Sequence, residues 1–166
     1  MTVVLRPLRP GDAPDLVEVF VQAFQHGYTE VLPADVLATV APDTVAGWFA
    51  RWAASLSTTV AEVDGVPAGF VRYGDDDEEP DPTAGYVAAL YVHPDASGAG
   101  IGRRLLDHAM DSLTDRGRTA VSLWVFRDNE RARGLYDRAG FEPDGTEMVD
   151  PQWRVPQIRM RRSLPR

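Results

Sequence analysis

The feature that most constrains this chain is an apolar stretch, then three alternate glycines, then an amphipathic stretch. Apolar residues 90–92 precede Gly98, Gly100 and Gly102, and apolar residues recur at helical spacing over 105–113. Glycines let the backbone adopt positive φ and approach a ligand closely. The first amides of a helix have no intrahelical partner, and the helix dipole favours an anion there. The segment therefore predicts a strand, a glycine loop and a helix that can hold phosphate.

The spacing of the glycines narrows the choice of phosphate compound. The pattern G-x-G-x-G is one residue shorter than the dinucleotide fingerprint G-x-G-x-x-G, and no acidic residue closes a second strand at the required distance. The chain also has no G-K-S or G-K-T for a nucleoside triphosphate loop. A tight strand-to-helix turn without a ligand is the alternative interpretation.

A second segment, residues 127–141, predicts a helix with an unusual face. Asp128 is a suitable N-cap and Gly140 suits the position after the C-cap. Asn129, Ala132 and Tyr136 stand at i, i+3 and i+7, so they share one face. This face carries an amide, a small residue and a phenol, where a packing face would carry leucine or valine. The alternative is that Asn129 is only a cap and Tyr136 only a tyrosine at the edge of the core.

The remaining periodicity predicts an alternation of strands and helices. Asp12 is expected to cap the first helix, and Asp64-Gly65 is typical of a type I′ hairpin turn. The expected strands are 3–5, 58–63, 67–73, 85–92, 119–125 and the final antiparallel pair 141–149 and 155–161. The expected helices are 13–25, 34–40, one opening at Pro42 with Val45, Trp48, Phe49 and Trp52 inward, 100–116, and the helix that begins near Asn129.

Together the two segments resemble the GNAT N-acetyltransferase superfamily. Its acetyl-CoA loop, Q/R-x-x-G-x-G/A, is similar to Ser97–Gly102, and its N-x-x-A-x-x-L-Y-x-x-x-G-F segment matches Asn129–Phe141. Residues 27–33 resemble the A-Y-x-G-x-L-P segment of a bacterial subgroup. The resemblance implies one N-acetyltransferase domain over residues 3–166. It also implies a mixed α/β fold, with a mostly antiparallel twisted sheet of about seven strands, about four flanking helices, and a splay at the acetyl-CoA strand.

The resemblance also implies roles for individual residues. The Leu90 amide would polarise the thioester carbonyl, and Tyr136 would protonate the coenzyme A thiolate, which suits a phenol with an ordinary pKa of about 10. Asn129 would bind the pantetheine arm. The implied cofactor-binding residues are Leu90, Tyr91, Val92, Ser97, Gly98, Ala99, Gly100, Ile101, Gly102, Arg103, Asn129, Ala132, Arg133 and Tyr136. No metal is expected.

Two departures from the family pattern concern the site. Ser97 replaces the usual Gln or Arg, which would shift part of the pyrophosphate binding to Arg103 or Arg104. Tyr86 stands where the subgroup often carries a glutamate that serves as general base. The sequence therefore leaves three candidates for the general base, which are His26, Glu30 and Tyr86. Tyr28, Glu30 and Tyr86 are expected to line the acceptor pocket.

Composition excludes several function classes. The net charge of −8 argues against nucleic-acid binding. The chain has no cysteine, which excludes disulfides, thiolate metal sites and a cysteine nucleophile. No apolar run is long enough to span a membrane and the start lacks a signal-peptide pattern, so we expect a cytoplasmic protein. The acidic run 75–82 is either a solvated loop or an attractor for a cationic amine.

The sequence thus predicts an acetyl-CoA-dependent N-acetyltransferase. The expected acceptor is the primary amine of a small cationic molecule, such as a polyamine, an aminoglycoside-like compound, an amino acid or a peptide N-terminus. Acetyl transfer is expected by direct attack in a ternary complex. Two alternatives are an N-acetyltransferase for proteins or peptides and a non-catalytic acyl-CoA-binding module. A homodimer is expected from the resemblance.

Overall fold

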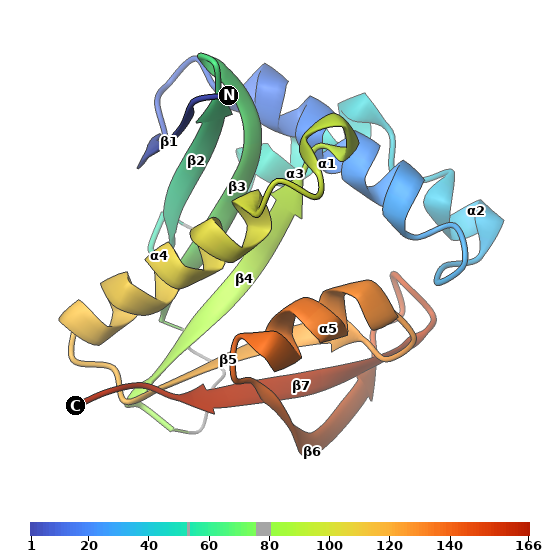
Figure 1. Cartoon of the computed structure of the whole chain (residues 1–166). Helices are drawn as coiled ribbons and strands as arrows, with labels where there is room; N and C mark the ends of the chain where they lie inside the picture. The colour runs from blue at the N-terminus through green and yellow to red at the C-terminus, as the bar shows by residue number, and fades with distance from the viewer. Residues whose placement is uncertain (53, 76–80) are drawn as a thin grey trace.

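The fold is a seven-stranded sheet with helices on both faces (Figure 1). The computed structural model describes residues 1–52, 54–75 and 81–166. The strands lie in the order β1-β2-β3-β4-β5-β7-β6, and β4 and β5 are the parallel neighbours in an otherwise antiparallel sheet. The mostly antiparallel seven-stranded sheet is therefore confirmed. The strands are β1 (Val3–Pro7), β2 (Ser57–Val63), β3 (Val66–Asp75), β4 (Ala84–Val92), β5 (Ala120–Phe126), β6 (Glu142–Val149) and β7 (Pro156–Ser163).

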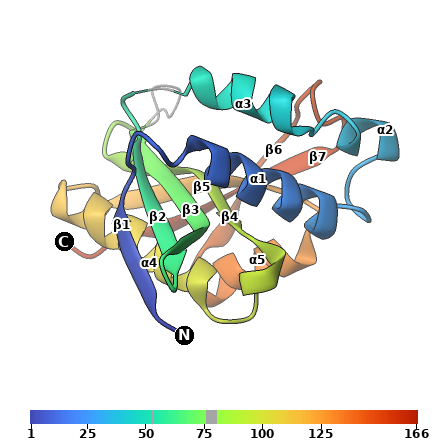
Figure 2. The same cartoon turned by 90° about the horizontal axis from the view of Figure 1, so that it is seen from above.

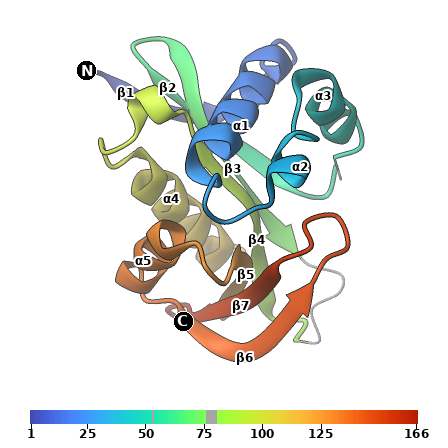
Figure 3. The same cartoon turned by 90° about the vertical axis from the view of Figure 1, so that its right-hand side faces the viewer.

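Five α-helices in the described residues cover the two faces of the sheet. Seen from above, α2 and α3 lie on one side and α4 and α5 on the other (Figure 2), and the side view separates α1–α3 from α4 and α5 in the same way (Figure 3). None of the helices in the described ranges is long and apolar enough to cross a membrane. The resemblance implied about four helices, whereas the periodicity predicted the five that are observed, although α2 is a single turn and shorter than the predicted 34–40. The helices are α1 (Ala13–Gly27), α2 (Ala34–Leu37), α3 (Pro42–Ala50), α4 (Ile101–Asp115) and α5 (Glu130–Arg138), with a short 3-10 turn at Pro94–Ala96.

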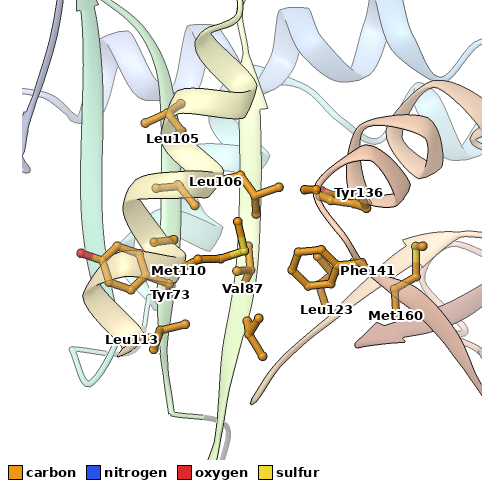
Figure 4. Packing of buried hydrophobic residues seen from close by; sticks show 14 of the residues in the cluster. Tyr73, Val87, Leu105, Leu106, Met110, Leu113, Leu123, Tyr136, Phe141 and Met160 are labelled. Atoms are coloured by element: carbon orange, nitrogen blue, oxygen red, sulfur yellow. The ribbon is translucent and has the colours of Figure 1, made fainter. Parts of the chain in front are cut away.

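The side chains of the central strands point alternately to the two faces of the sheet and pack into two hydrophobic cores. On β3, Phe70 packs with the α1–α3 core, whereas Val71 and Tyr73 pack with the core under α4 and α5. Figure 4 shows the latter core around Val87 and Met110. Because strand residues alternate between faces, a sheet with a core on both faces needs strands that are buried along most of their length, as β3 is.

Asp12 stands at the N-cap position of α1 as predicted, but its side chain does not cap the helix. Its side chain makes no cap hydrogen bond; instead Arg6 Nη1 and Nη2 each donate to an Asp12 carboxylate oxygen at 2.8 Å, and the Arg9 amide donates to it at 2.7 Å. Arg6 also pairs with Glu62 on β2. Two parallel hydrogen bonds from a guanidinium bind a carboxylate more strongly than one backbone amide of the helix start does, which explains why the carboxylate turns toward Arg6.

The cap of α5 is also one residue away from its predicted position. Asn129, not Asp128, is the N-cap, and its side-chain oxygen accepts from the Ala132 amide at 3.2 Å. The Asp128 carboxylate lies 3.6 Å from Arg127 Nε at the surface. Gly140 has a φ of 91° just beyond the end of α5, as predicted for a residue after the C-cap.

Both predicted hairpins are confirmed. Asp64 and Gly65 have φ values of 50° and 85°, the positive pair that a type I′ turn requires. The final strands β6 and β7 pair antiparallel. Residues 76–80 of the acidic run lie outside the described residues. On either side of them, Asp75 pairs with Arg118 at 2.8 Å and Asp81 pairs with Arg161 at 2.6 Å.

Candidate active site

Strands β4 and β5 separate half-way along their length, and the site lies where they part. Within the described residues, the parallel register pairs Ala84–Val87 with Ala120–Leu123 and then stops. Beyond this point the two strands diverge (Figure 1). The second half of β4 therefore keeps β3 on one edge and loses β5 on the other. This is the splay that the family resemblance implies.

The free edge of β4 carries backbone donors. The His93 amide donates to the Ala68 carbonyl oxygen at 2.8 Å, on the β3 side. Successive residues of a strand direct their N–H groups to opposite edges, so the amides of Val92 and Leu90 point away from β3. They face the gap where β5 has departed, which is the direction in which Leu90 was predicted to act.

A cavity of about 440 Å³ brings the two sequence motifs together at this gap. It is lined by the end of β4, by the glycine loop, and by the predicted face of α5. Ala99 is exposed and is not among the lining residues, and the Arg133 guanidinium instead donates to the Arg127 carbonyl oxygen at 2.9 Å. The predicted cofactor residues that line the cavity are Leu90, Tyr91, Val92, Ser97, Gly98, Gly100, Ile101, Gly102, Arg103, Asn129, Ala132 and Tyr136.

The glycine loop turns sharply into α4. Gly98 and Gly100 have φ values of 83° and 77°, in the left-handed region that side-chain-bearing residues avoid, and Gly100 is the N-cap of α4. The amides at the start of α4 have no intrahelical acceptor and line the cavity wall. The loop therefore has the geometry of an anion-binding helix start, as predicted.

Three arginines line this cavity and add positive charge to it, and only one of them was predicted from the sequence. Arg103 was predicted; it pairs with Asp107 at 2.9 Å and donates to the Arg138 carbonyl oxygen at 3.3 Å. Arg131 and Arg138 also line the cavity. In the sequence they belong to an arginine-rich helix surface, and only the packing of α5 beside the glycine loop shows which of these arginines face the cavity.

Three tyrosines cluster where the cavity meets the sheet. Burial raises the pKa of Tyr28 to about 12 and raises the pKa values of Tyr91 and Tyr136 well above the ordinary range. All three phenols therefore keep their protons at neutral pH. Tyr136 is 9% exposed and its ring packs edge-on against Phe141 at 5.9 Å, so its position is fixed by the core (Figure 4).

A second cavity, of about 350 Å³, lies on the other side of the same strand ends. Its wall is rich in aromatic residues and includes rings from α1, from Trp52 and from Trp153. Arg72 and Asp150 are the charged residues among the described residues that line it. Tyr28, Leu90, Tyr91, Asn129, Ala132 and Tyr136 line both cavities. The two cavities therefore share part of their lining, which includes Leu90 and Tyr136.

The residues predicted for the acceptor and the base are only partly assembled. Tyr28 and Tyr86 line the second cavity, whereas Glu30 is exposed and lines neither cavity. His26 lines the first cavity. His93 accepts from the Asp95 amide at 3.1 Å and so caps the 3-10 turn. Among the described residues, no cluster of histidine and carboxylate side chains could hold a metal ion.

Comparison with known proteins identifies the family. The model of the Acetyltransferase (GNAT) family matches residues 16–141, a range that includes both sequence motifs and most of both cavities. The chain belongs to the GNAT family. Its fold agrees with solved GNAT structures: the PaiA N-acetyltransferase of Thermoplasma acidophilum in complex with coenzyme A aligns with a TM-score of 0.77 at 19% identity, over 98% of this chain and 99% of that one. YncA, a putative acetyltransferase from Salmonella typhimurium with acetyl-CoA, aligns with a TM-score of 0.74 at 23% identity, over 100% and 96% of the two chains.

Sequence relatives of this GNAT chain have diverse names. The L-amino acid N-acyltransferase MnaT of Escherichia coli is 30% identical over 138 residues, which are 82% of this chain and 78% of that protein. A mycothiol acetyltransferase of Beutenbergia cavernae is 47% identical over 77 residues, but the match spans only 46% of this chain and 25% of that longer protein. The relatives agree on acyl transfer and differ in the acceptor that their names give.

Proposed function

We propose that this chain is an acetyl-CoA-dependent N-acetyltransferase that acetylates the primary amine of a small molecule by direct attack in a ternary complex. The observation that carries the proposal is the meeting of two cavities at Leu90 and Tyr136. One cavity offers a phosphate-binding loop and the other an aromatic chamber, so two reactants can reach these residues from opposite sides. We place the reaction in the cytoplasm, where acetyl-CoA is available, and take residues 3–166 as the catalytic domain.

The chemistry of the first cavity fits acetyl-CoA. The unpaired amides at the start of α4 suit the pyrophosphate, because helix starts bind anions. The outward-facing amides of Leu90 and Val92 suit the pantetheine arm, which would lie against β4 like an added strand. Arg131 and Arg138 would add positive charge beside the phosphate groups. Ser97 replaces the Gln or Arg that is usual at its position, and these arginines from α5 would compensate for the donor that is lost there.

The residues at the meeting point can assist each part of the transfer. Acetyl-CoA supplies an acetyl group activated as a thioester. The Leu90 amide would donate to the carbonyl oxygen as negative charge develops there. A C–N bond forms to the amine while the C–S bond breaks, and the Tyr136 phenol gives its proton, or a hydrogen bond, to the departing thiolate. Because burial raises the pKa of Tyr136, this phenol carries its proton at neutral pH.

The amine must lose its proton before or during attack. Of the three candidate bases, Tyr86 lines the second cavity and His26 lines the first, whereas Glu30 lines neither. The proton would therefore leave through water past Tyr86 or His26. The glutamate that related enzymes use at the position of Tyr86 is replaced here by a phenol, so the proton route differs from theirs.

A small acceptor fits the second cavity better than a protein chain does. Its volume of about 350 Å³ is in the range of sites for small molecules, and aromatic rings line much of it. Asp150 gives this cavity a carboxylate that suits an ammonium group, as expected for a cationic amine. Because MnaT is named as an L-amino acid N-acyltransferase, amino acids are a necessary part of any test of the acceptor.

Acetyl transfer to a panel of acceptors tests this function. The protein is incubated with acetyl-CoA and polyamines, aminoglycosides, amino acids or short peptides, and thiol release and product mass are followed together. We expect acetylated product from a small amine and equimolar coenzyme A. Acetylation of peptides alone would favour a peptide acetyltransferase. Tight acetyl-CoA binding without transfer to any amine would favour an acyl-CoA-binding module and contradict the proposal.

A further inference from the structure

Tyr28 and Tyr136 reach the lining that the two cavities share from opposite faces of the sheet. Tyr28 directly follows α1 and packs against the α1–α3 core, whereas Tyr136 belongs to α5 and to the core under α4 and α5. The side view shows α1 and α5 on the two sides of the sheet (Figure 3). Both residues nevertheless line both cavities. The fold therefore places two phenols, one from each face, beside the proposed path of the transfer.

The position of Tyr28 is fixed by its backbone and by its ring. Its amide donates to the Phe24 carbonyl oxygen at 3.1 Å, and its own carbonyl oxygen accepts from the amides of Val31 and Leu32 at 3.1 and 2.9 Å. Its ring packs edge-on against Phe24 and Phe126, with ring centres 4.4 and 5.5 Å away. These contacts hold the phenol in a defined place, as proton transfer to or from a reactant requires.

Neither phenol uses its hydroxyl to hold the fold together. Among the described residues, the hydroxyls of Tyr28 and Tyr136 have no hydrogen-bond partner, and neither oxygen is sealed from the cavities. A buried tyrosine usually gives its hydroxyl a partner, as Tyr73 does with Ser112 Oγ at 3.4 Å. The hydroxyls of Tyr28 and Tyr136 are thus available to the reactants.

The pKa of Tyr136 sets a condition on the transfer of its proton. Burial raises this pKa well above the ordinary range, and repulsion from Tyr28 raises it further, because the two phenols lie within electrostatic reach of each other. A thiol has an ordinary pKa of about 8.5, so the loss of a proton from Tyr136 to the thiolate is uphill and leaves a buried phenolate. Tyr136 must therefore receive a proton as it gives one away.

The attacking amine is a source of that proton. Its nitrogen becomes positively charged as the C–N bond forms, and it must then lose one N–H proton to give the amide. The departing thiolate needs one proton to give the thiol. One proton therefore has to travel from the acceptor to the cofactor, and proton transfer by a positioned side chain accelerates such a step.

We propose that Tyr28 is a second catalytic residue, which takes this proton from the amine nitrogen and passes its own proton to Tyr136, directly or across one water molecule, as Tyr136 protonates the thiolate. This inference rests on the proposed acetyltransferase function. The N–H and C–S bonds break, the C–N and S–H bonds form, and both phenols end the step protonated. An acceptor that arrives as an ammonium ion loses its first proton to water, so the relay carries the second. No carboxylate is needed for this proton, in agreement with Tyr86 at the position where the subgroup often carries a glutamate.

A double-mutant cycle with Tyr28→Phe and Tyr136→Phe tests the relay. The measurements use acetyl-CoA and whichever small amine of the acceptor panel the wild type acetylates best. Tyr28→Phe keeps the ring contacts and removes the hydroxyl, and we expect kcat to fall about 100-fold while KM and the Kd of acetyl-CoA change by less than about 3-fold. The double variant should also be slower than wild type by about 100-fold, not by the roughly 10,000-fold of two independent groups, because residues that act as a unit are not additive.

Solvent isotope effects give a readout that a structural role would not move. The rate of a single turnover is measured in mixtures of H2O and D2O, so that product release does not enter. If the protons of both phenols move in one step, the wild-type rate bows below a straight line as the fraction of D2O rises, and Tyr28→Phe should come closer to the line. Tyr73→Phe is the matched control, because Tyr73 is a buried phenol that lines neither cavity, and it should behave like wild type. Thermal unfolding verifies that each variant is folded.

The results that would overturn the relay differ from those that would overturn the function. Turnover by Tyr28→Phe within about 3-fold of wild type overturns the relay, because Tyr136 would then act without Tyr28. Losses that multiply in the double variant, or a straight isotope plot for the wild type, also overturn it. Each of these results leaves the acetyltransferase function intact, whereas no transfer to any acceptor overturns both proposals.

Discussion

At the scale of single residues, Tyr136 is the side chain on which the proposed chemistry most depends. Tyr136 lines both cavities, and its ring packs against Phe141. Tyr136→Phe removes the proton donor and keeps the ring. Because general acid catalysis contributes at least about 100-fold, we expect kcat to fall by about that factor while the Kd of acetyl-CoA changes by less than about 3-fold. Steady-state kinetics and calorimetry measure the two effects.

Tyr73→Phe is the matched control for this variant. Tyr73 is also a buried phenol, but it lies toward Ser112, with the two hydroxyls 3.4 Å apart, and lines neither cavity. Its loss should leave kcat unchanged. Equal turnover by wild type and Tyr136→Phe would remove Tyr136 from the chemistry and leave it as a packing residue.

The Arg6–Asp12 ion pair is a second residue-scale feature, and it concerns stability. Arg6 lowers the pKa of Asp12, so the carboxylate contributes stability above the unfolded-state pKa of about 4 and loses it as pH falls through the lower folded-state pKa. Asp12→Asn leaves a buried guanidinium with half of its charge partners, and we expect a loss of about 3 kcal/mol in the free energy of unfolding at pH 7. Urea unfolding at neutral pH measures this loss.

The pH dependence separates the ion pair from simple packing. The difference between wild type and Asp12→Asn should shrink as pH falls below about 4, because both then carry a neutral side chain at position 12. Asp35→Asn is the control, since the Asp35 pair with Arg154 is exposed on both sides and should contribute nothing measurable. A constant difference over the whole acid range would contradict the electrostatic explanation.

At the scale of elements, the glycine loop and α4 are the proposed cofactor anchor. Gly100 has a φ of 77° at the N-cap of α4, and a side chain there is strained by about 1 kcal/mol. Gly100→Ala should therefore lower stability by about that amount and weaken acetyl-CoA binding at least about 5-fold, because the loop amides move. Thermal unfolding and calorimetry measure the two changes.

Gly117 provides a control with the same backbone strain and no role in the cavity. It has a φ of 81° just after α4 and is not among the cavity-lining residues. Gly117→Ala should show the same loss of stability with an unchanged Kd. If both variants bind acetyl-CoA like wild type, the glycine loop does not hold the cofactor.

Much of this element-scale organisation could be predicted from the sequence, because strand and helix periods and turn chemistry are local properties. The strand–loop–helix unit at Leu90–Asp115 and the hairpin at Asp64 are examples. Caps were less predictable: Asp12 was available to a partner from another element, and Asn129 competed with its neighbour Asp128. Both outcomes depend on tertiary contacts that sequence spacing does not contain.

The lining of the second cavity was the least predictable part of the site. Arg72 is a charged residue inside an apolar strand, and only the packing of Trp52 over β3 shows that it is buried beside a cavity. Asp150 lies in a turn with no motif of its own. The expected Glu30 stands close in sequence to Tyr28, but it is exposed in the loop that follows α1 and lines neither cavity.

At the scale of the whole molecule, the divergence of the parallel strands β4 and β5 determines where the proposed site lies. A two-sided core holds α1–α3 on one face and α4 and α5 on the other, and the splay lets cavities on the two faces meet. The net charge of −8 does not oppose a negatively charged cofactor here, because Arg103, Arg131 and Arg138 line the cavity that would receive it. Local charge, not net charge, decides this binding.

A crystal structure of the protein with acetyl-CoA tests this account most directly. We expect the pyrophosphate over the amides of Gly98–Gly102, the thioester oxygen within hydrogen-bond distance of the Leu90 amide, and the sulfur beside the Tyr136 hydroxyl. The acetyl group should point into the second cavity. Acetyl-CoA bound away from the gap between β4 and β5, or with its thioester remote from Leu90 and Tyr136, would contradict the account.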